Sequence, residues 1–126
     1  MKKRHFTTGF LLLCIGLYGS CMLDKENLTG TWQAVAFYEG GHDVRTRLDS
    51  VSLLLRPDGG YAFNSQGQYR ESGTYRTSAA FLFLTDTSTQ PPLEHTLKVL
   101  YLSPDTLKIK MMRDTNEQVL FLVKTE

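Results

Sequence analysis

The chain has 126 residues, of which 41% are hydrophobic and 21% are charged, a composition typical of a single globular domain. Its net charge is +1, but Lys2, Lys3 and Arg4 lie at the N-terminus, and without these three residues it is −2. The rest of the chain therefore has no excess of positive charge to attract nucleic acid, and we expect no nucleic-acid partner.

The first 20 residues have the order of a bacterial export signal. Met1–His5 is positively charged, and Phe10–Tyr18 is an apolar run. A membrane-spanning helix needs about 20 apolar residues, so this run is too short to be one. Gly19 and Ser20 then precede Cys21, an order that resembles a lipobox. We expect cleavage before Cys21 and lipidation (palmitate) of this cysteine; an ordinary signal peptide with an incidental Cys21 is the alternative.

Lipidation at Cys21 predicts a lipoprotein held on the membrane by its N-terminal acyl chains. Residues 21–27 then form a short lipidated tether, and the location is the bacterial cell envelope, with the outer membrane preferred and its face left open. Cys14 would leave with the signal peptide. The exported domain would then have no disulfide and would depend on its core for stability.

The hexapeptide Leu28–Gln33 marks the entry into the folded domain, residues 28–126, and contains the single tryptophan, Trp32. After it, polar and apolar residues alternate in short runs, and Arg56–Gly60 has the composition of a tight turn. Eight strands are predicted, at 31–38, 51–56, 61–63, 69–76, 81–84, 96–101, 107–111 and 119–123. Short links favour an all-β, up-and-down antiparallel barrel of eight strands, with a two-sheet sandwich as the alternative.

The alternation also predicts which side chains face the interior of the barrel. The inward set is Trp32, Val51, Leu53, Leu55, Tyr61, Phe63, Tyr75, Phe83, Val99, Tyr101, Ile109, Met111 and Phe121. Apolar residues of the opposite parity would lie outside, namely Leu54, Leu82, Leu84, Leu120 and Leu122. A barrel of eight strands either fills with its own side chains or holds one small ligand, and the sequence leaves both open.

Three motifs, Gly30–Trp32, Pro57–Tyr61 and Ser72–Tyr75, resemble the lipocalin-like domain of small Bacteroidetes-type lipoproteins. The resemblance extends from Leu28 to Lys124. It implies a calycin-type barrel with Trp32 closing the base and a basic residue of the last strand, here Lys124, stacking on the tryptophan.

A lipocalin-like barrel of this kind predicts a binding protein, with a small apolar or amphipathic ligand inside the barrel. Tyrosines would offer such a ligand both an apolar ring and a hydroxyl. The candidate ligand-binding residues are Trp32, Tyr61, Phe63, Tyr75, Phe83 and Tyr101. The alternative is a protein-interaction module, an accessory subunit or inhibitor, that contacts an envelope protein through its outer face or the loop at residues 39–48.

Catalytic and metal sites are not predicted, and neither is a cofactor. His42, next to Asp43, and His95 lack a third ligand at metal-binding spacing, and the chain has no nucleophile-elbow motif. Glu71 lies on the face that carries Tyr69. One interpretation is a buried Glu71 with Arg70 or Arg76 nearby, and an ordinary salt bridge at the surface or the barrel mouth is the alternative.

Two short patterns, Asp49-Ser50-Val51 and Asp105-Thr106-Leu107, are similar to the O-glycosylation sites of exported Bacteroidetes proteins. Ser50 and Thr106 would be the modified residues. Chance is the alternative, because such residues are common where strands begin.

Overall fold

The computed structural model describes residues 23–44, 48–65, 68–113 and 115–125, so the predicted signal peptide and Cys21 lie outside the described residues. Within these ranges the chain forms one short helix, α2 (Lys25–Leu28), and nine strands. The strands are β1 (Gly30–Glu39), β2 (His42–Asp43), β3 (Ser52–Leu55), β4 (Gly60–Asn64), β5 (Arg70–Ser78), β6 (Phe81–Asp86), β7 (Leu93–Leu102), β8 (Thr106–Arg113) and β9 (Asn116–Lys124).

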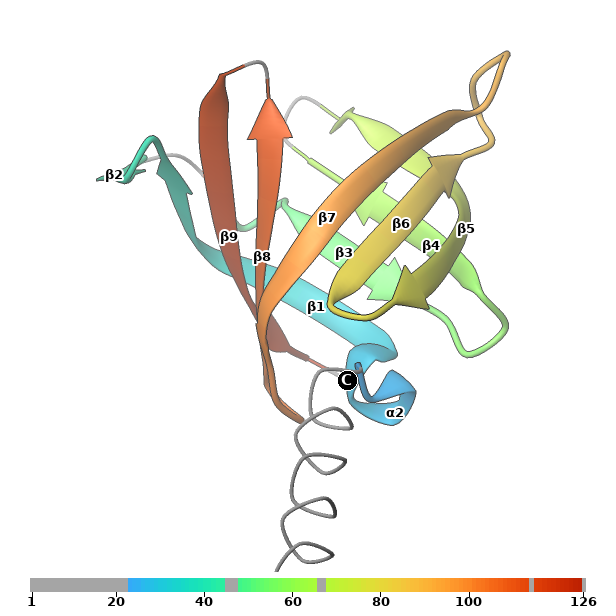
Figure 1. Cartoon of the computed structure of the whole chain (residues 1–126), viewed down its shortest axis with the longest axis horizontal. Coiled ribbons are helices and arrows are strands. Elements are labelled where there is room, and N and C mark those ends of the chain that lie inside the picture. The colour runs from blue at the N-terminus through green and yellow to red at the C-terminus, as the bar shows by residue number, and fades with distance from the viewer. Residues whose placement is uncertain (1–22, 45–47, 66–67, 114, 126) are drawn as a thin grey trace, which may run out of the picture.

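The sheet closes on itself. From β3 to β9 each strand pairs antiparallel with the next one along the chain, and β1 pairs with both β3 and β9. Trp32 lies opposite Lys124 and Tyr38 lies opposite Val119, so the first and last long strands meet. The eight strands other than β2 therefore form the predicted barrel, and the two-sheet sandwich is wrong (Figure 1).

Two short elements add to the predicted pattern. In the predicted loop, β2 pairs with the end of β1. Helix α2 includes the last three residues of the predicted tether, and the Asp24 carboxylate caps the helix by accepting a hydrogen bond from the backbone N–H of Glu26 at 3.0 Å. Leu23 already packs against the core. Consequently a residue only two positions after Cys21 in the sequence already packs against the core of the domain.

The turn between β3 and β4 forms as its residues predict. The carboxylate of Asp58 accepts a hydrogen bond from the backbone N–H of Gly60 at 2.9 Å, and Gly59 has a φ of 91°, which favours glycine. The Tyr75 hydroxyl donates to the Arg56 carbonyl at 2.8 Å. This bond ties the turn to β5.

The interior of the barrel is packed mostly with leucine. Its fully buried side chains come from α2 and from strands around the barrel; the largest are Trp32, Tyr61, Leu28, Leu53, Leu55, Leu82, Leu107 and Leu122. Burying each such side chain stabilises the fold by roughly 1.5–3 kcal/mol. Eight of the thirteen predicted inward residues are buried: Trp32, Val51, Leu53, Leu55, Tyr61, Tyr75, Val99 and Ile109. Phe63 and Met111 are partly buried and pack against this core.

The predicted orientation of β6 and β9 is wrong. Leu82 and Leu84 are buried in place of Phe83, and Leu120 and Leu122 are buried in place of Phe121. Both strands are apolar on both faces, so alternation alone does not identify the inner face. The predicted apolar exterior is therefore wrong at these four leucines, while Leu54 is half-buried.

Two bulges change the face of later residues. In β7 the register with β8 shifts between Val99 and Tyr101, and Tyr101 is 56% exposed instead of inside the barrel. In β1 the register with β9 shifts between Ala34 and Ala36. Because a shift of one residue exchanges the two faces of a strand, the side chains beyond each bulge are turned relative to strict alternation.

Candidate ligand-binding site

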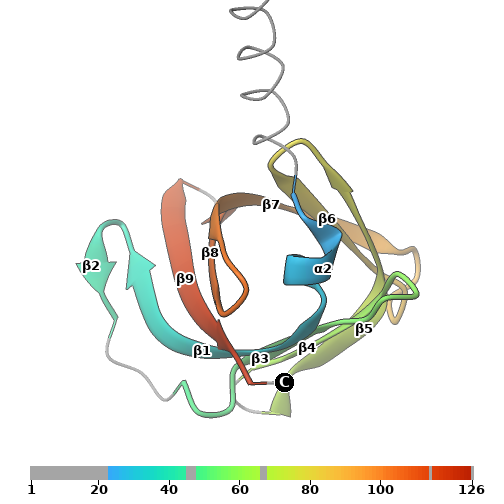
Figure 2. The same ribbon diagram turned by 90° about the horizontal axis from the view of Figure 1, so that it is seen from below.

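One end of the barrel, the base, is closed by helix α2. Seen from below, α2 lies within the ring of strands, on the side of β4 and β6 (Figure 2). Trp32 is fully buried there, and its indole N–H donates a hydrogen bond to the Leu28 carbonyl at 2.8 Å. The Lys124 ammonium lies 4.9 Å from the centre of the Trp32 ring and donates to the Asn27 carbonyl at 2.7 Å. The predicted pairing of Lys124 with Trp32 is confirmed, and it holds α2 to the last strand.

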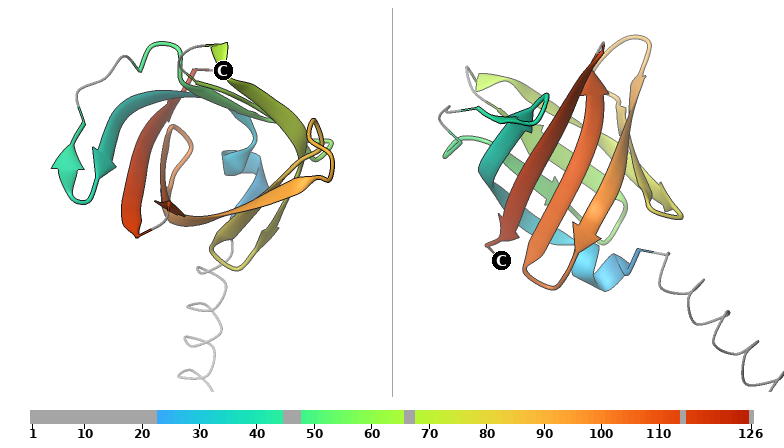
Figure 3. Two further views of the ribbon diagram at one scale, coloured as in Figure 1. Left: turned by 90° about the horizontal axis from the view of Figure 1, so that it is seen from above. Right: turned by 60° about the vertical axis from the view of Figure 1, so that its left-hand side comes forward.

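The opposite end of the barrel, which we call the mouth, is formed by the last residues of β1, β4, β6 and β8 and the first residues of β5, β7 and β9. Figure 3 (left) shows this end from above, ringed by strand ends and loops. Phe37, Phe63 and Met111 lie on these strands near the mouth, and Leu48 precedes β3; all four are partly buried and pack against the core. The apolar interior therefore continues up to the mouth.

A polar cluster lies within this apolar wall, and we define it as the buried Tyr61 and Glu71 with the partly exposed Tyr69 and His95. Glu71 is only 8% exposed. One oxygen of its carboxylate accepts a hydrogen bond from the Tyr61 hydroxyl at 2.9 Å, and the other accepts one from the Tyr69 hydroxyl. His95 Nε2 lies 3.6 Å from Glu71 Oε1. A carboxylate, two phenols and an imidazole thus converge near the mouth of the barrel.

Strand pairing explains this convergence. Glu71 of β5 lies opposite Phe63 of β4, and His95 of β7 lies opposite Leu84 of β6. Leu84 is buried, and Glu71 shares its strand face with the buried Tyr75, so these positions point into the barrel. Burial, together with the hydrogen bond to Glu71 and its charge, raises the pKa of the Tyr61 phenol well above its ordinary value. Tyr61 is therefore a hydrogen-bond donor at neutral pH.

Asp86 is a second buried carboxylate near the mouth, at the end of β6. Hydrogen bonds from the Ser88 hydroxyl and backbone N–H hold the pKa of the Asp86 carboxyl below its usual range. Across the barrel, the buried Gln118 amide donates to Glu39 at 3.1 Å. The mouth therefore combines apolar and hydrogen-bonding groups.

No family model and no curated protein matches this chain. A solved structure of a lipocalin-like protein from Bacteroides uniformis does align with it, with a TM-score of 0.56 and 16% sequence identity. The alignment covers 78% of this chain and 98% of that one. The fold is lipocalin-like. The fold implied by the sequence resemblance is confirmed, and at this low identity the likeness concerns the fold alone.

The lipocalin-like barrel places the predicted ligand-binding residues in three different surroundings. Tyr61 belongs to the polar cluster, and Phe63 lies beside it, 6.4 Å from Tyr69 between ring centres. Trp32 is at the base, and Tyr75 is buried with its hydroxyl on the turn. The inward placement of two further residues is wrong: Phe83 lies on the outer face under the Arg76 guanidinium, and Tyr101 is exposed.

Of the two interpretations of Glu71, the structure has the buried one, but the expected arginine neighbours are wrong. Arg76 pairs with Glu94 at 3.4 Å on the outside of the barrel, and Arg70 is exposed. The sequence signal for Glu71 was its position on one strand face with Tyr69 and Tyr75. His95 had no such signal, because its contact with Glu71 crosses from β7 to β5 and depends on closure of the barrel.

In the described residues no group of three or more histidine, cysteine, aspartate and glutamate side chains could hold a metal ion. His42 is exposed in β2, away from the polar cluster. Among the same residues, no helix is long and apolar enough to span a membrane.

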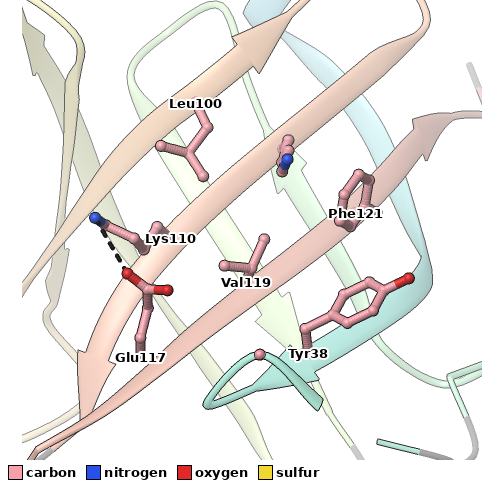
Figure 4. Close-up of a pocket in the computed structure, with 8 residues that line it drawn as sticks. Tyr38, Leu100, Lys110, Glu117, Val119 and Phe121 are labelled. Carbon is pink, nitrogen blue, oxygen red and sulfur yellow. Dashed lines mark ion pairs between the residues drawn. The ribbon is translucent and has the colours of Figure 1, made fainter. Parts of the chain in front are cut away.

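A depression of about 430 Å³ lies on the outer face, across β1, β9, β8 and β7. Leu100, Val119, Phe121 and Tyr38 form its apolar part, and the Lys110–Glu117 ion pair of 3.4 Å borders it (Figure 4). The remaining lining residues are Gly41 and Lys108. Leu100, at the bulge of β7, lines one side of the depression. Tyr38 and Gly41, from the hairpin of β1 and β2, also line it.

Proposed function

We propose that this protein is a lipid-anchored binding protein of the bacterial cell envelope that holds a small apolar or amphipathic ligand at the barrel mouth. The observation that carries this proposal is Glu71, a carboxylate held inside an apolar barrel at the end opposite the sealed base. Burying a polar group is costly for folding unless it is hydrogen-bonded, and here a set of such groups lies at the end of the barrel opposite α2. Ligand sites in proteins typically combine an apolar wall with a few placed polar groups.

The apolar groups near the mouth would contact the apolar part of the ligand. Phe37, Phe63 and Met111 are only partly buried by the protein itself, so they retain surface for a guest. Each 100 Å² of apolar surface covered by a guest would contribute about 2.5 kcal/mol before the cost of association. Tyr69 and His95, both partly exposed, would contact its polar part.

Native mass spectrometry of protein extracted from cell envelopes tests ligand binding. We expect a bound molecule that is released on denaturation. Phe63→Glu, which places a charge in the apolar part of the mouth, should reduce its occupancy. Phe83→Glu is the matched control, because Phe83 is a phenylalanine of the outer face. Equal occupancy in the two variants would contradict binding at the mouth.

The anchor at Cys21 is part of the same proposal and is supported by the lipobox-like order of the sequence. Because Leu23 already packs against the core, an anchored barrel would stand with its base close to the membrane and its mouth facing away. Metabolic labelling with palmitate tests the anchor. Cys21→Ser should abolish labelling, whereas Cys14→Ser should leave it unchanged; labelling that survives Cys21→Ser would refute the anchor.

A second candidate function, docking of an envelope protein partner, is favoured by the outer depression that contains Tyr38, Leu100 and Phe121. A photo-crosslinking residue at Leu100 should then capture one stoichiometric partner. The same residue at Thr77, an exposed position of β5, serves as the control. The same yield at both positions would exclude this depression as a specific interface.

A further inference from the structure

We propose that the polar end of the ligand is a primary ammonium group bound by Glu71 and His95. This inference rests on the proposed function, because it names the chemical class of the guest held at the mouth. It follows from the hydrogen-bonding capacity that the polar cluster leaves unused.

Glu71 has unused acceptor capacity. Each carboxylate oxygen offers two lone pairs, and the Tyr61 and Tyr69 hydroxyls occupy one lone pair on each oxygen. Within the described part of the chain, one lone pair therefore remains on each oxygen. The carboxylate is also short of positive charge, since its ion pair in the described part of the chain is with His95, which is charged only when protonated.

His95 supplies an independent observation. Its Nε2 atom is buried and has no hydrogen-bond partner among the described residues, although it lies 3.6 Å from Glu71 Oε1. A buried polar atom without a partner costs stability, so such an atom calls for an explanation. In the tautomer with its proton on Nδ1, a neutral His95 would present Nε2 as an acceptor beside the free lone pairs of Glu71.

These acceptors match the donors of a primary ammonium group. The two remaining lone pairs of Glu71 and one of His95 Nε2 provide three acceptors, and an alkylammonium has three N–H donors. Its positive charge would also compensate the buried carboxylate. A carboxylate guest would meet the opposite situation, because it would bring a second negative charge to Glu71. The alkyl chain would extend along Phe63 towards Met111 in the partly buried apolar wall.

Binding of octylamine, octanoate and octanol, which share one chain length, tests this inference. The measurement is isothermal titration calorimetry at pH 7.5 on the full chain in lipid nanodiscs, with empty nanodiscs as the blank. We expect octylamine to bind at least ten-fold more tightly than octanoate or octanol. Glu71→Gln, which keeps the shape of the side chain, should reduce octylamine affinity at least ten-fold. Glu94→Gln is the matched control, because Glu94 is a β7 carboxylate on the outside of the barrel, and it should have no effect.

The outcomes separate the two proposals. Octanoate or octanol binding as tightly as octylamine would overturn the ammonium site and leave the apolar binding function standing. No binding of any of the three compounds above the blank would overturn both. A preference for octylamine that persists in folded Glu71→Gln would overturn the assignment to Glu71. The comparison of the three compounds on the unmodified protein decides the class of ligand even where a variant fails to fold.

Discussion

The contact of Lys124 with the base gives a quantitative prediction about stability. Lys124→Met keeps most of the aliphatic side chain but removes the hydrogen bond to the Asn27 carbonyl and the cation above the Trp32 ring. A hydrogen bond from a charged group contributes about 1.5–3 kcal/mol, and a cation–π contact contributes about 0.5–1 kcal/mol where it is partly exposed. Since Lys124 is only half-buried, we expect the lower part of the summed range, a loss of about 2–3 kcal/mol in the free energy of unfolding.

Urea denaturation measures this loss directly. Trp32 is the only tryptophan, so its fluorescence reports unfolding of the base in the same experiment. For a small domain the unfolding free energy falls by about 1–3 kcal/mol per molar urea, so the midpoint should fall by roughly 0.7–3 M. Lys124→Arg should keep most of the stability, because a guanidinium remains charged and stacks well on aromatic rings.

Lys98→Met is the control for the loss of a positive charge. Lys98 is exposed on β7, and surface substitutions of this kind usually change stability by less than about 0.5 kcal/mol. If Lys124→Met and Lys98→Met lower the urea midpoint equally, the contact between Lys124, α2 and Trp32 does not hold the base closed, and our account of this end of the barrel is wrong.

Two further predictions concern packing and pH. In Gly73→Ala the new methyl group would overlap the backbone carbonyl of Thr85. We therefore expect the free energy of unfolding, measured by urea denaturation, to fall by about 1–3 kcal/mol. Gly60→Ala is the comparison: its methyl group would meet a flexible arginine side chain that can move away, and a loss as large as that of Gly73→Ala would argue against this explanation. Burial raises the pKa values of the Tyr61 and Tyr75 phenols in the folded state, whereas tyrosines of the unfolded chain ionise near pH 10. The contribution of these phenols to stability is therefore fully present below about pH 10 and falls as the pH rises further. A urea midpoint that stays constant from pH 8 to pH 11 would contradict this predicted loss of stability.

The sequence by itself determined the architecture of this protein. Alternating runs and turn residues, such as those of Arg56–Gly60, are local signals, because strand faces and turn geometry depend on neighbours in the chain. They were sufficient to predict eight strands in up-and-down order, and Trp32 with Lys124 indicated how the two ends of the barrel chain would meet.

The tertiary structure alone decided which face of several strands became the interior. Phe83 and Phe121 lie in strands that are apolar on both faces, so the packing of neighbouring strands selected the leucines beside them. Tyr101 was turned outward by a bulge that no local pattern marks. The polar cluster arose in the same way, because Glu71 and His95 come from strands that are not adjacent in the sheet and meet only where the barrel wall curves round.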